Sequence, residues 1–191
     1  MIYFEDNFLN DTEYKAVQDD IVSDEFKGIE VGDKVFHVHF PSDSVTQMIE
    51  RAVSAREGGK VKNILSFYRI ATDTIDTDWR IHSDQKIEGV QPARAVVLYL
   101  SPSPEPCVMT GTAFWKHHTY GHELPENTPN EEFDRTLLED SNDTSKWELS
   151  SVVGHAPNRM VSYPASYFHS KYPNVAWPDG RVVFVMFYSY E

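Results

Sequence analysis

Apolar residues recur along the chain at two different spacings, and the change between them falls near residue 60. Within 12–21 and again within 45–53 they repeat every three to four positions, which is typical of helices that bury one face. The residues that cap or end these helices are Asn10 or Asp11, Ser42-Asp43-Ser44 and Gly58-Gly59. The first sixty residues are therefore predicted to form mainly helical support.

From residue 61 onward the pattern changes to short runs rich in aromatic and β-branched residues, separated by Pro and Gly, which predicts strands. One earlier stretch alternates apolar and polar residues and predicts a single strand that ends before Pro41. The predicted strands are Ile29–Phe40, Ile64–Thr72, Trp79–His82, Ala93–Leu100, Gly111–Trp115, Met160–Pro164 and Arg181–Tyr190. Many short strands with such turns indicate a sandwich or a barrel.

A polar and acidic segment, residues 119–157, interrupts these strands. It carries two weak helical patterns, Asn130–Glu139 and Thr144–Val153. Long polar loops on a rigid barrel usually carry function. We therefore expect this insertion to lie over one mouth of the barrel and to position substrate, while the chemistry rests on the strands.

Length and composition indicate one globular domain. The chain has 191 residues, of which 40% are hydrophobic and 13% aromatic, and no linker or block of charge divides it. We expect residues 1–191 to form a single domain, in which 1–60 support a core formed by 61–191.

Charge, cysteine content and the absence of a long apolar run argue against several classes of protein. The net charge of −13, without any dense Lys/Arg cluster, argues against a nucleic-acid partner, because such proteins normally present a basic patch. The single cysteine, Cys107, excludes an internal disulfide, and no His or Lys stands near it in sequence to make it reactive. No segment resembles a signal peptide or approaches the roughly 20 apolar residues of a membrane span. We expect a cytoplasmic protein without a membrane partner.

Three residues suit a metal site. His82 and Asp84 are separated by one residue at the end of the strand predicted over Trp79–His82, so the two-residue period of a strand places both on one face. His169 follows the Met160–Pro164 strand in a mostly apolar stretch. Two histidines and one carboxylate on one face of Fe(II), with three positions left open, form the ligand set used where O2 and a second substrate meet on the metal.

The order of these elements resembles that of the 2-oxoglutarate/Fe(II)-dependent oxygenase superfamily of the prolyl-hydroxylase type, and especially a small branch with a Gly-Thr-x-Phe strand after the metal motif. Here that strand begins Gly111-Thr112-Ala113-Phe114, and the first helix is entered through Asp6-Asn7-Phe8-Leu9. The resemblance covers nearly the whole chain, and its specificity lies in the ensemble of motifs. It implies a mainly β fold with flanking N-terminal helices, namely a double-stranded β-helix (a cupin-like jelly roll) in residues 61–191.

The resemblance also implies an activity. A non-haem Fe(II) dioxygenase of this kind is an oxidoreductase that uses 2-oxoglutarate and O2 to hydroxylate a substrate, and it releases succinate and CO2. His82, Asp84 and His169 match the metal ligands of the family.

Three further residues match positions that bind the cosubstrate in the family. Arg181, 12 residues after His169, would hold the distal carboxylate of 2-oxoglutarate through two parallel charge-assisted hydrogen bonds. Tyr99 and Tyr68 match tyrosines that hydrogen-bond the cosubstrate. Many relatives have Ser or Thr two residues after this Arg, whereas Val183 stands here. The extra hydrogen bond is then absent or comes from a tyrosine.

Alternatives remain open at the level of the residues. An Arg at the start of a strand is often a solvated surface charge, and both tyrosines can be ordinary core aromatics. A cupin-like isomerase or hydrolase that binds a metal without 2-oxoglutarate fits the same strands, as does a non-catalytic jelly-roll binding module. The sequence does not define the substrate, a small molecule or a peptide, or the oligomeric state. Residues without an assigned role are His117, His118, Asn158 and Arg159.

Overall fold

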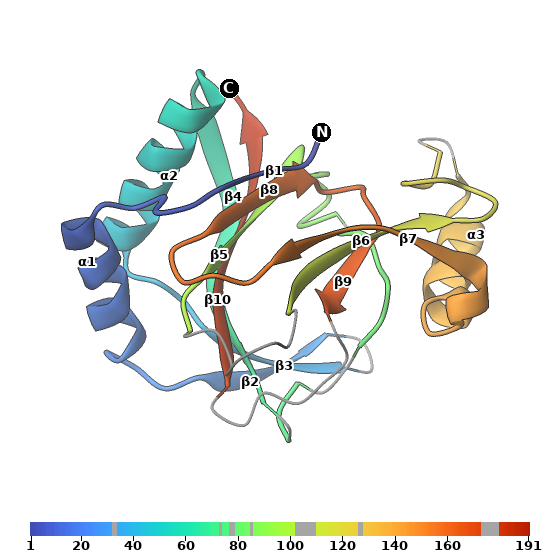
Figure 1. Ribbon diagram of the computed structural model, residues 1–191, viewed down its shortest axis with the longest axis horizontal. Coiled ribbons are helices and arrows are strands. Elements are labelled where there is room, and N and C mark those ends of the chain that lie inside the picture. The colour runs from blue at the N-terminus through green and yellow to red at the C-terminus, as the bar shows by residue number, and fades with distance from the viewer. Residues whose placement is uncertain are drawn as a thin grey trace.

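The computed structural model describes the chain apart from residues 32–33, 73, 77–78, 85, 102–109, 126–127 and 173–179 and the side chain of Asn130. Cys107 and the expectation for its thiol lie outside the described residues. The described strands form two antiparallel sheets that face each other, and helices flank them (Figure 1). This arrangement is the double-stranded β-helix, or jelly roll, predicted from the sequence.

The larger sheet is formed by β1 (Tyr3–Glu5), β2 (Lys27–Val31), β3 (Lys34–His39), β4 (Val61–Ala71), β5 (Arg94–Tyr99), β8 (Met160–Pro164) and β10 (Arg181–Tyr190). The smaller sheet is formed by β6 (Gly111–His117), β7 (Trp147–Gly154) and β9 (His169–Tyr172). The strand order is β1-β8-β5-β10-β4-β3-β2 in the larger sheet and β7-β6-β9 in the smaller one. All neighbouring strands are antiparallel.

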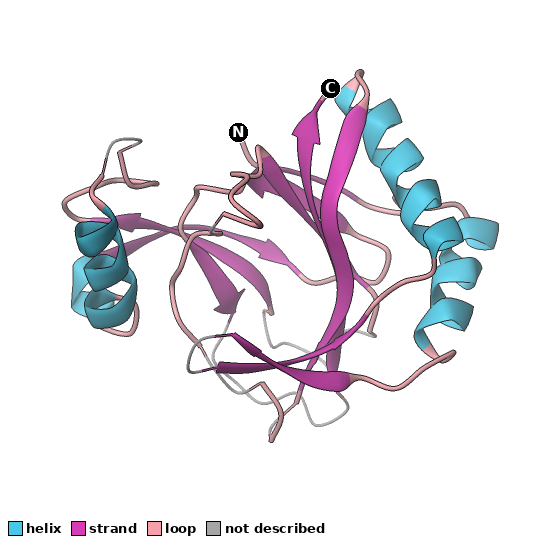
Figure 2. Ribbon diagram, turned by 180° about the vertical axis from the view of Figure 1, so that it is seen from behind, coloured by secondary structure: helices cyan, strands magenta, loops and turns pink. Residues whose placement is uncertain are grey.

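Two helices, α1 (Asp11–Ile21) and α2 (Asp43–Glu57), cover the outer face of the larger sheet (Figure 2). The cap residues act as predicted. Asn10 forms a capping box with Glu13, Ser42 accepts a hydrogen bond from the amide of Val45, and Gly58 ends α2 with a left-handed φ of 69°. The apolar faces of both helices pack on outward residues of the sheet. This core includes Leu9, Val17, Val45, Ile49, Val53, Val96, Leu98, Met160, Phe184 and Met186.

The inner face of the same sheet points toward the smaller sheet. Because side chains alternate along a strand, each strand serves both cores. On β10, Phe184 belongs to the helix-side core, whereas Val183 and Val185 belong to the core between the sheets. Cross-strand partners share a face, so Tyr99, opposite Val183, points inward, and Tyr68, opposite Phe184, points outward.

The predicted strand Ile29–Phe40 is two strands, β2 and β3, which pair as an antiparallel hairpin with Val31 opposite Lys34. Gly and Asp stand between them in the sequence, and both are favoured residue types in short hairpin connections. Apolar residues recur throughout both strands, so the sequence pattern did not show where β2 ends and β3 begins. The segment 1–60 therefore contributes strands as well as helices to the fold.

Two other predictions from the sequence were wrong. The stretch Trp79–His82 is not a strand, and only His82 makes an isolated bridge, to His169. The weak helical pattern over Thr144–Val153 is a short 3₁₀ turn, η2 (Thr144–Lys146), followed by strand β7, because pairing with β6 satisfies the backbone there. The other pattern is confirmed as α3 (Asn130–Arg135), which continues into the π-turn η1 (Thr136–Asp140).

Asn158 and Arg159, whose roles the sequence left open, bind the N-terminal segment to the barrel. The Asn158 amide accepts from the Leu9 N–H (3.0 Å) and donates to the Leu9 carbonyl (2.7 Å). Arg159 forms a two-point pair with Asp6 and donates to the carbonyl of Gly154. Among the described residues, no helix is long and apolar enough to cross a bilayer.

The close approach of β6 and β7 requires a glycine at position 111, which predicts a large effect of substitution. A Cβ at Gly111 would lie 1.9 Å from the backbone oxygen of Val153, so one strand has to move. We expect Gly111→Ala to lower the free energy of unfolding in urea by about 1–3 kcal/mol or more. Gly59→Ala is the control, because a Cβ there meets nothing within 4 Å. Equal stability of the two variants would contradict this view of the smaller sheet.

Candidate metal centre

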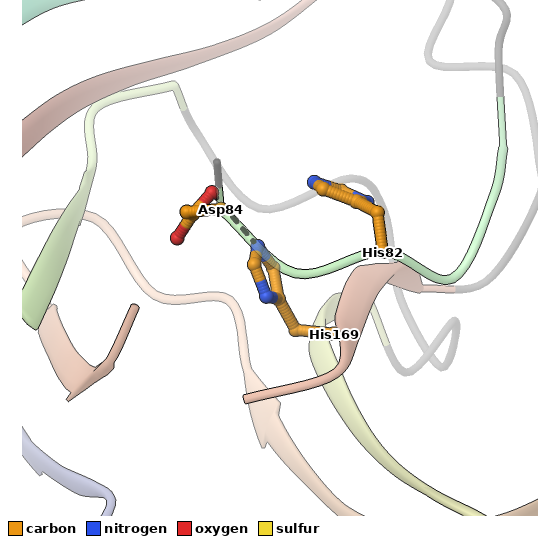
Figure 3. A group of neighbouring side chains, drawn as sticks. All are labelled: His82, Asp84 and His169. Atoms are coloured by element: carbon orange, nitrogen blue, oxygen red, sulfur yellow. Dashed lines mark ion pairs between the residues drawn. The ribbon is translucent and has the colours of Figure 1, made fainter. Parts of the chain in front are cut away.

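His82, Asp84 and His169, the three residues that the resemblance matched to metal ligands, lie close together (Figure 3). Their candidate ligand atoms all lie within 4.8 Å of one another. His169 opens β9, and the other two residues belong to the segment 79–84 between β4 and β5. His82 and His169 exchange both backbone hydrogen bonds, at 3.0 and 2.8 Å, and the Asp84 N–H donates to the carbonyl of Ala165. The backbone therefore fixes all three positions.

Both imidazoles are oriented by the same local contact. Nδ1 of His82 lies 3.1 Å from the carbonyl of Arg80, and Nδ1 of His169 lies 2.8 Å from the carbonyl of Tyr167. A carbonyl accepts only, so Nδ1 carries the proton and Nε2 of each ring keeps a lone pair that can accept a hydrogen bond or bind a ligand. Burial holds the pKa of His82 well below its usual range, and the neighbouring His169 lowers it further. His82 is thus neutral, as metal ligation requires.

Asp84 is the acid that this arrangement leaves unsatisfied. One carboxylate oxygen lies 3.7 Å from Nε2 of His169, and the other, Oδ2, is buried without a hydrogen-bond partner among the described residues. Burial raises the pKa of Asp84 to about 6. A buried, poorly partnered carboxylate beside two lone-pair nitrogens is costly in the metal-free protein and is satisfied by a divalent cation.

Tyr163 is a site residue that the sequence analysis missed. Its hydroxyl lies 3.2 Å from Nε2 of His169, the side chain is buried, and it lines the cavity. Burial, together with the nearby Asp84, keeps its pKa well above 10, so the phenol stays protonated and can donate. The alternation within β8 is the signal that was available, since Val161 and Tyr163 share the inward face.

Arg181, the first residue of β10, is buried and lines the same cavity. Its Nε has no hydrogen-bond partner among the described residues, and the guanidinium lies over the ring of Tyr99 at 5.5 Å. Burial lowers its pKa, which remains that of a strong base. The alternative of a solvated surface charge is therefore wrong. A buried guanidinium with an unused donor calls for an anion.

Tyr99 lies beneath Arg181 on the inward face of β5. Its hydroxyl contacts Thr112 Oγ1 at 2.7 Å and donates to the carbonyl of Val153 at 3.3 Å. His155, which the sequence did not single out, stacks on the Tyr99 ring at 4.6 Å and hydrogen-bonds the carbonyl of Ser101. Burial lowers the pKa of His155 to about 4, so this ring packs as a neutral group. Together these contacts fix the floor under Arg181.

The assignment of Tyr68 to the cosubstrate is corrected. Tyr68 lies on the outward face of β4, packs against Phe184 and His39, and donates its hydroxyl to Asp20 at 2.9 Å. Its strand neighbour Arg69 takes the inward place instead. Tyr68 had been assigned by its match to a tyrosine of the resembling family, and one position along a strand separates the outward face of Tyr68 from the inward face of Arg69.

Arg69 is another cation that lines the cavity. It forms a two-point pair with the buried Asp76, in which the Nη2 contact is 2.7 Å, and it covers the ring of Phe36 at 4.5 Å. Lys171 donates to the backbone carbonyl of Asp76 at 2.5 Å. Arg69 is therefore held by a carboxylate of the protein, in contrast to Arg181.

The insertion supports the metal segment directly. Ile81 is buried against Leu137 and Trp147, and its N–H donates to the carbonyl of Ser141 at 3.0 Å. His117 contacts Asp140 at 3.2 Å, which ties the end of β6 to the same insertion. The chemistry was expected to depend on residues of the strands alone. The segment that carries His82 and Asp84 is instead held partly by contacts with the insertion. His118 is exposed and takes no part.

The three candidate ligands, Arg181 and Tyr163 all line one cavity of about 530 Å³. Other parts of its wall come from the β2–β3 hairpin, from inward residues of β4 and β10, from β5, β6 and β9, from the segment that carries the metal motif, and from α3 and η1. The volume lies within the range of small-molecule sites.

Comparison with known proteins identifies solved structures of the same fold. No protein-family model and no curated protein sequence matches the chain. The carbocyclase SnoK from nogalamycin biosynthesis, described as non-heme and alpha-ketoglutarate-dependent, has a TM-score of 0.67 at 14% identity over 98% of this chain and 79% of its own. HygX from Streptomyces hygroscopicus, with nickel, 2-oxoglutarate and hygromycin B bound, has a TM-score of 0.63 at 12% identity over 98% and 82%.

A prolyl hydroxylase from Trichoplax adhaerens, in complex with a hypoxia-inducible-factor peptide, has a TM-score of 0.58 at 12% identity over 98% of this chain and 82% of its own. At such low identity the likeness establishes the fold. The chain therefore has the jelly-roll fold of 2-oxoglutarate-dependent oxygenases over nearly its whole length.

The raised pKa of Asp84 predicts how the metal-free protein responds to pH. The folded-state pKa of about 6 exceeds the ordinary 3.8, so ionisation of Asp84 costs stability as pH rises from about 4 through 6. We expect Asp84→Asn to stabilise the metal-free protein at pH 8 by up to about 3 kcal/mol and to have little effect at pH 4. Urea unfolding across this range measures it, with Asp134→Asn, an exposed position, as control. A gain independent of pH would contradict the burial argument.

Proposed function

We propose that this protein is an Fe(II)- and 2-oxoglutarate-dependent oxygenase that hydroxylates its substrate. The observation that carries the proposal is a pair of unsatisfied groups in one cavity. Asp84 Oδ2 lacks a partner beside two oriented imidazoles, and Arg181 Nε lacks one on the inner face of β10. Asp84 with the two imidazoles fits a divalent cation, and Arg181 fits a carboxylate.

The donor set is of the type suited to iron(II). Nε2 of His82, Nε2 of His169 and a carboxylate oxygen of Asp84 would bind one side of the ion and leave the other side open to ligands. When bound, Fe(II) with 2-oxoglutarate supplies O2-dependent oxidation of a C–H bond, with release of succinate and CO2. The remaining work falls to the protein.

Arg181 would bind the distal carboxylate of 2-oxoglutarate and hold it in one orientation through two donors of its planar guanidinium. Tyr99 keeps Arg181 in place from below, and its hydroxyl stays with Thr112. Tyr163 would donate to an oxygen that approaches beside His169, since its proton is retained well above neutral pH. The apolar residues of the inner face exclude water, which strengthens each of these charged contacts.

The solved structures of the same fold support the proposed cofactors more strongly than they support the proposed reaction. HygX holds nickel and 2-oxoglutarate, and SnoK is described as alpha-ketoglutarate-dependent. Their named activities include a carbocyclase and an epimerase, so this fold serves several oxidations. Hydroxylation is the outcome we propose here, as the prolyl hydroxylases among the neighbours suggest. A cupin-like isomerase or a binding module would have no use for the buried Arg181.

The proposed metal centre predicts a spectroscopic signal. Anaerobic addition of Fe(II) and 2-oxoglutarate should give a weak visible charge-transfer absorption, and O2 should then release succinate, because both need the three ligands together. We expect His82→Ala and His169→Ala to abolish absorption and succinate, whereas His118→Ala, at an exposed position, retains both. An absorption that survives both ligand substitutions would refute the assignment.

The proposed role of Arg181 predicts a change in cosubstrate affinity. Arg181→Leu should raise the half-saturating concentration of 2-oxoglutarate by about 10-fold to 1000-fold, the range for losing a buried charge-assisted pair. The half-saturating concentration for Arg181→Lys should lie between those of the wild type and Arg181→Leu, because an ammonium restores the charge without the planar guanidinium. Arg135→Leu, on the exposed face of α3, is the control. Unchanged affinity in Arg181→Leu would remove Arg181 from the site.

A further inference from the structure

The inner face of the larger sheet carries two arginines as diagonal neighbours. Arg181 on β10 lies opposite Ala71 on β4, and Arg69, two residues earlier on β4, lies opposite Val183. Diagonal neighbours in an antiparallel pair are roughly 7–8 Å apart, so both guanidiniums belong to one part of the cavity wall. They lean to opposite sides, Arg69 toward β3 and Arg181 toward β5. Two like charges held so close repel each other.

Asp76 is the carboxylate that pairs with Arg69. Its side chain is 1% exposed, and it accepts hydrogen bonds from Nε and Nη2 of Arg69, the second at 2.7 Å. Asp76 is not among the residues that line the cavity, so it binds Arg69 without reaching the cavity itself. A guanidinium in a buried two-point pair has little capacity left for a second anion.

The turn after β4 fixes the place of Asp76. The Thr72 N–H donates to the carbonyl of Ile75 at 2.8 Å, and Thr72 Oγ1 accepts from the Ile75 N–H at 2.9 Å. Asp76 then adopts a left-handed φ of 52°, which a non-glycine residue adopts only at some cost. Lys171 donates to its backbone carbonyl and lies 4.0 Å from its Oδ1. The carboxylate is therefore held at one position beside Arg69.

The charge of Asp76 also acts on Arg181. Burial lowers the pKa of Arg181, the neighbouring Arg69 lowers it further, and Asp76 raises it. Asp76 thus offsets part of the repulsion that a second guanidinium on the same face exerts. Among the described residues, Arg181 has no carboxylate within ion-pair distance, whereas Arg69 has Asp76. The two arginines are neighbours, and the protein supplies an anion to only one of them.

Resting on the function proposed above, we propose that Asp76 determines which dicarboxylate the cavity retains. By occupying Arg69, it prevents a dicarboxylate from being held between two guanidiniums without the metal. A dicarboxylate then binds tightly only when one end binds the metal and the other end reaches Arg181. 2-Oxoglutarate offers a metal both a carboxylate and a keto oxygen, whereas succinate, the coproduct, lacks the keto oxygen and is released. Asp76 touches neither molecule and acts through Arg69, as a positioning residue.

A purely structural role for the same contacts makes a different prediction. The Arg69–Asp76 pair joins β4 to the segment that leads to the metal motif, and Lys171 joins this segment to β9. If these contacts only hold the segment in place, substitution of Asp76 lowers stability and leaves the selection of anions as it was. Anion affinity and stability, measured on the same variants, separate the two roles.

The test is calorimetric titration of Ni(II)-loaded protein with 2-oxoglutarate and with succinate, so that no turnover occurs. In Asp76→Asn the neutral amide offers Arg69 a single acceptor oxygen, which frees the guanidinium. We expect this variant to bind succinate about tenfold more tightly than the wild type does. 2-Oxoglutarate should gain less, because the metal and Arg181 already engage its two carboxylates. The ratio of the two dissociation constants should therefore fall about threefold or more.

Two matched variants control for charge. Arg69→Met/Asp76→Asn has the same net charge as the wild type and no freed guanidinium, so it should bind succinate as the wild type does. Asp134→Asn removes an exposed negative charge from the same cavity lining without freeing an arginine, and should change succinate binding less than about twofold. Urea unfolding of each variant reports stability. If Asp76→Asn does not fold, the double variant, which leaves neither charge unpaired, still has to match the wild type.

The outcomes are distinct. Asp76→Asn with lower stability and wild-type succinate binding would overturn the inference in favour of a structural role. A double variant that keeps the gain of Asp76→Asn would overturn it as well, because Arg69 would not be the cation that Asp76 occupies. A double variant that binds succinate more weakly than the wild type would show that Arg69 already binds anions. Succinate gained in Asp76→Asn while the wild type fails to bind 2-oxoglutarate would refute the oxygenase and support the role of Asp76.

Discussion

The reciprocal backbone hydrogen bonds between His82 and His169 are the contact on which the candidate site depends. They join a segment that is otherwise not a strand to the first residue of β9, in the smaller sheet. Each histidine then repeats the same local contact, from Nδ1 to the carbonyl two residues earlier. Because each Nδ1 is held by a carbonyl of its own segment, position and tautomer are set together. Asp84 completes the group through its own hydrogen bond to Ala165.

The surrounding structure keeps this bridge in place from two directions. From the insertion, Ser141 and the side chains around Ile81 hold the metal segment. From the larger sheet, the core between the sheets presents Tyr163 to His169 and Arg181 to the cavity. The site thus lies where three packed layers meet. Among the described residues that line the cavity, the buried side-chain atoms without a hydrogen-bond partner are Asp84 Oδ2 and Arg181 Nε, for which ligands are proposed. Arg69, equally inward, has Asp76 and is not among them.

Much of this was predictable from local pattern. The two N-terminal helices with their caps and most of the strands follow from spacing and residue type, whereas the three candidate ligands came from the order of motifs that resembles the oxygenase family. The division between β2 and β3 was missed because one apolar-rich run covers both strands, and β7 was taken for a helix because its partner β6 is distant in sequence. Tyr68 was assigned from the family resemblance, and a single sequence does not define which parity of a strand faces a cavity. Tyr163 and the contact of Ser141 with Ile81 depend on tertiary packing that no local pattern contains.

Side chains alternate along the ten residues of β10, so that one set faces the helices and the other faces the cavity. Val182, Phe184, Met186 and Tyr188 contact the helix side, and Arg181, Val183, Val185 and Phe187 face the cavity. Substitutions at the first set change the stability of the molecule alone, whereas substitutions at the second also change what the cavity accepts, since Val183 and Val185 belong to the core between the sheets as well. One half of a single strand can therefore alter ligand acceptance while the other half does not. A lineage could remodel the cavity for a new compound while its helix-facing residues, and the fold they maintain, stay as they were.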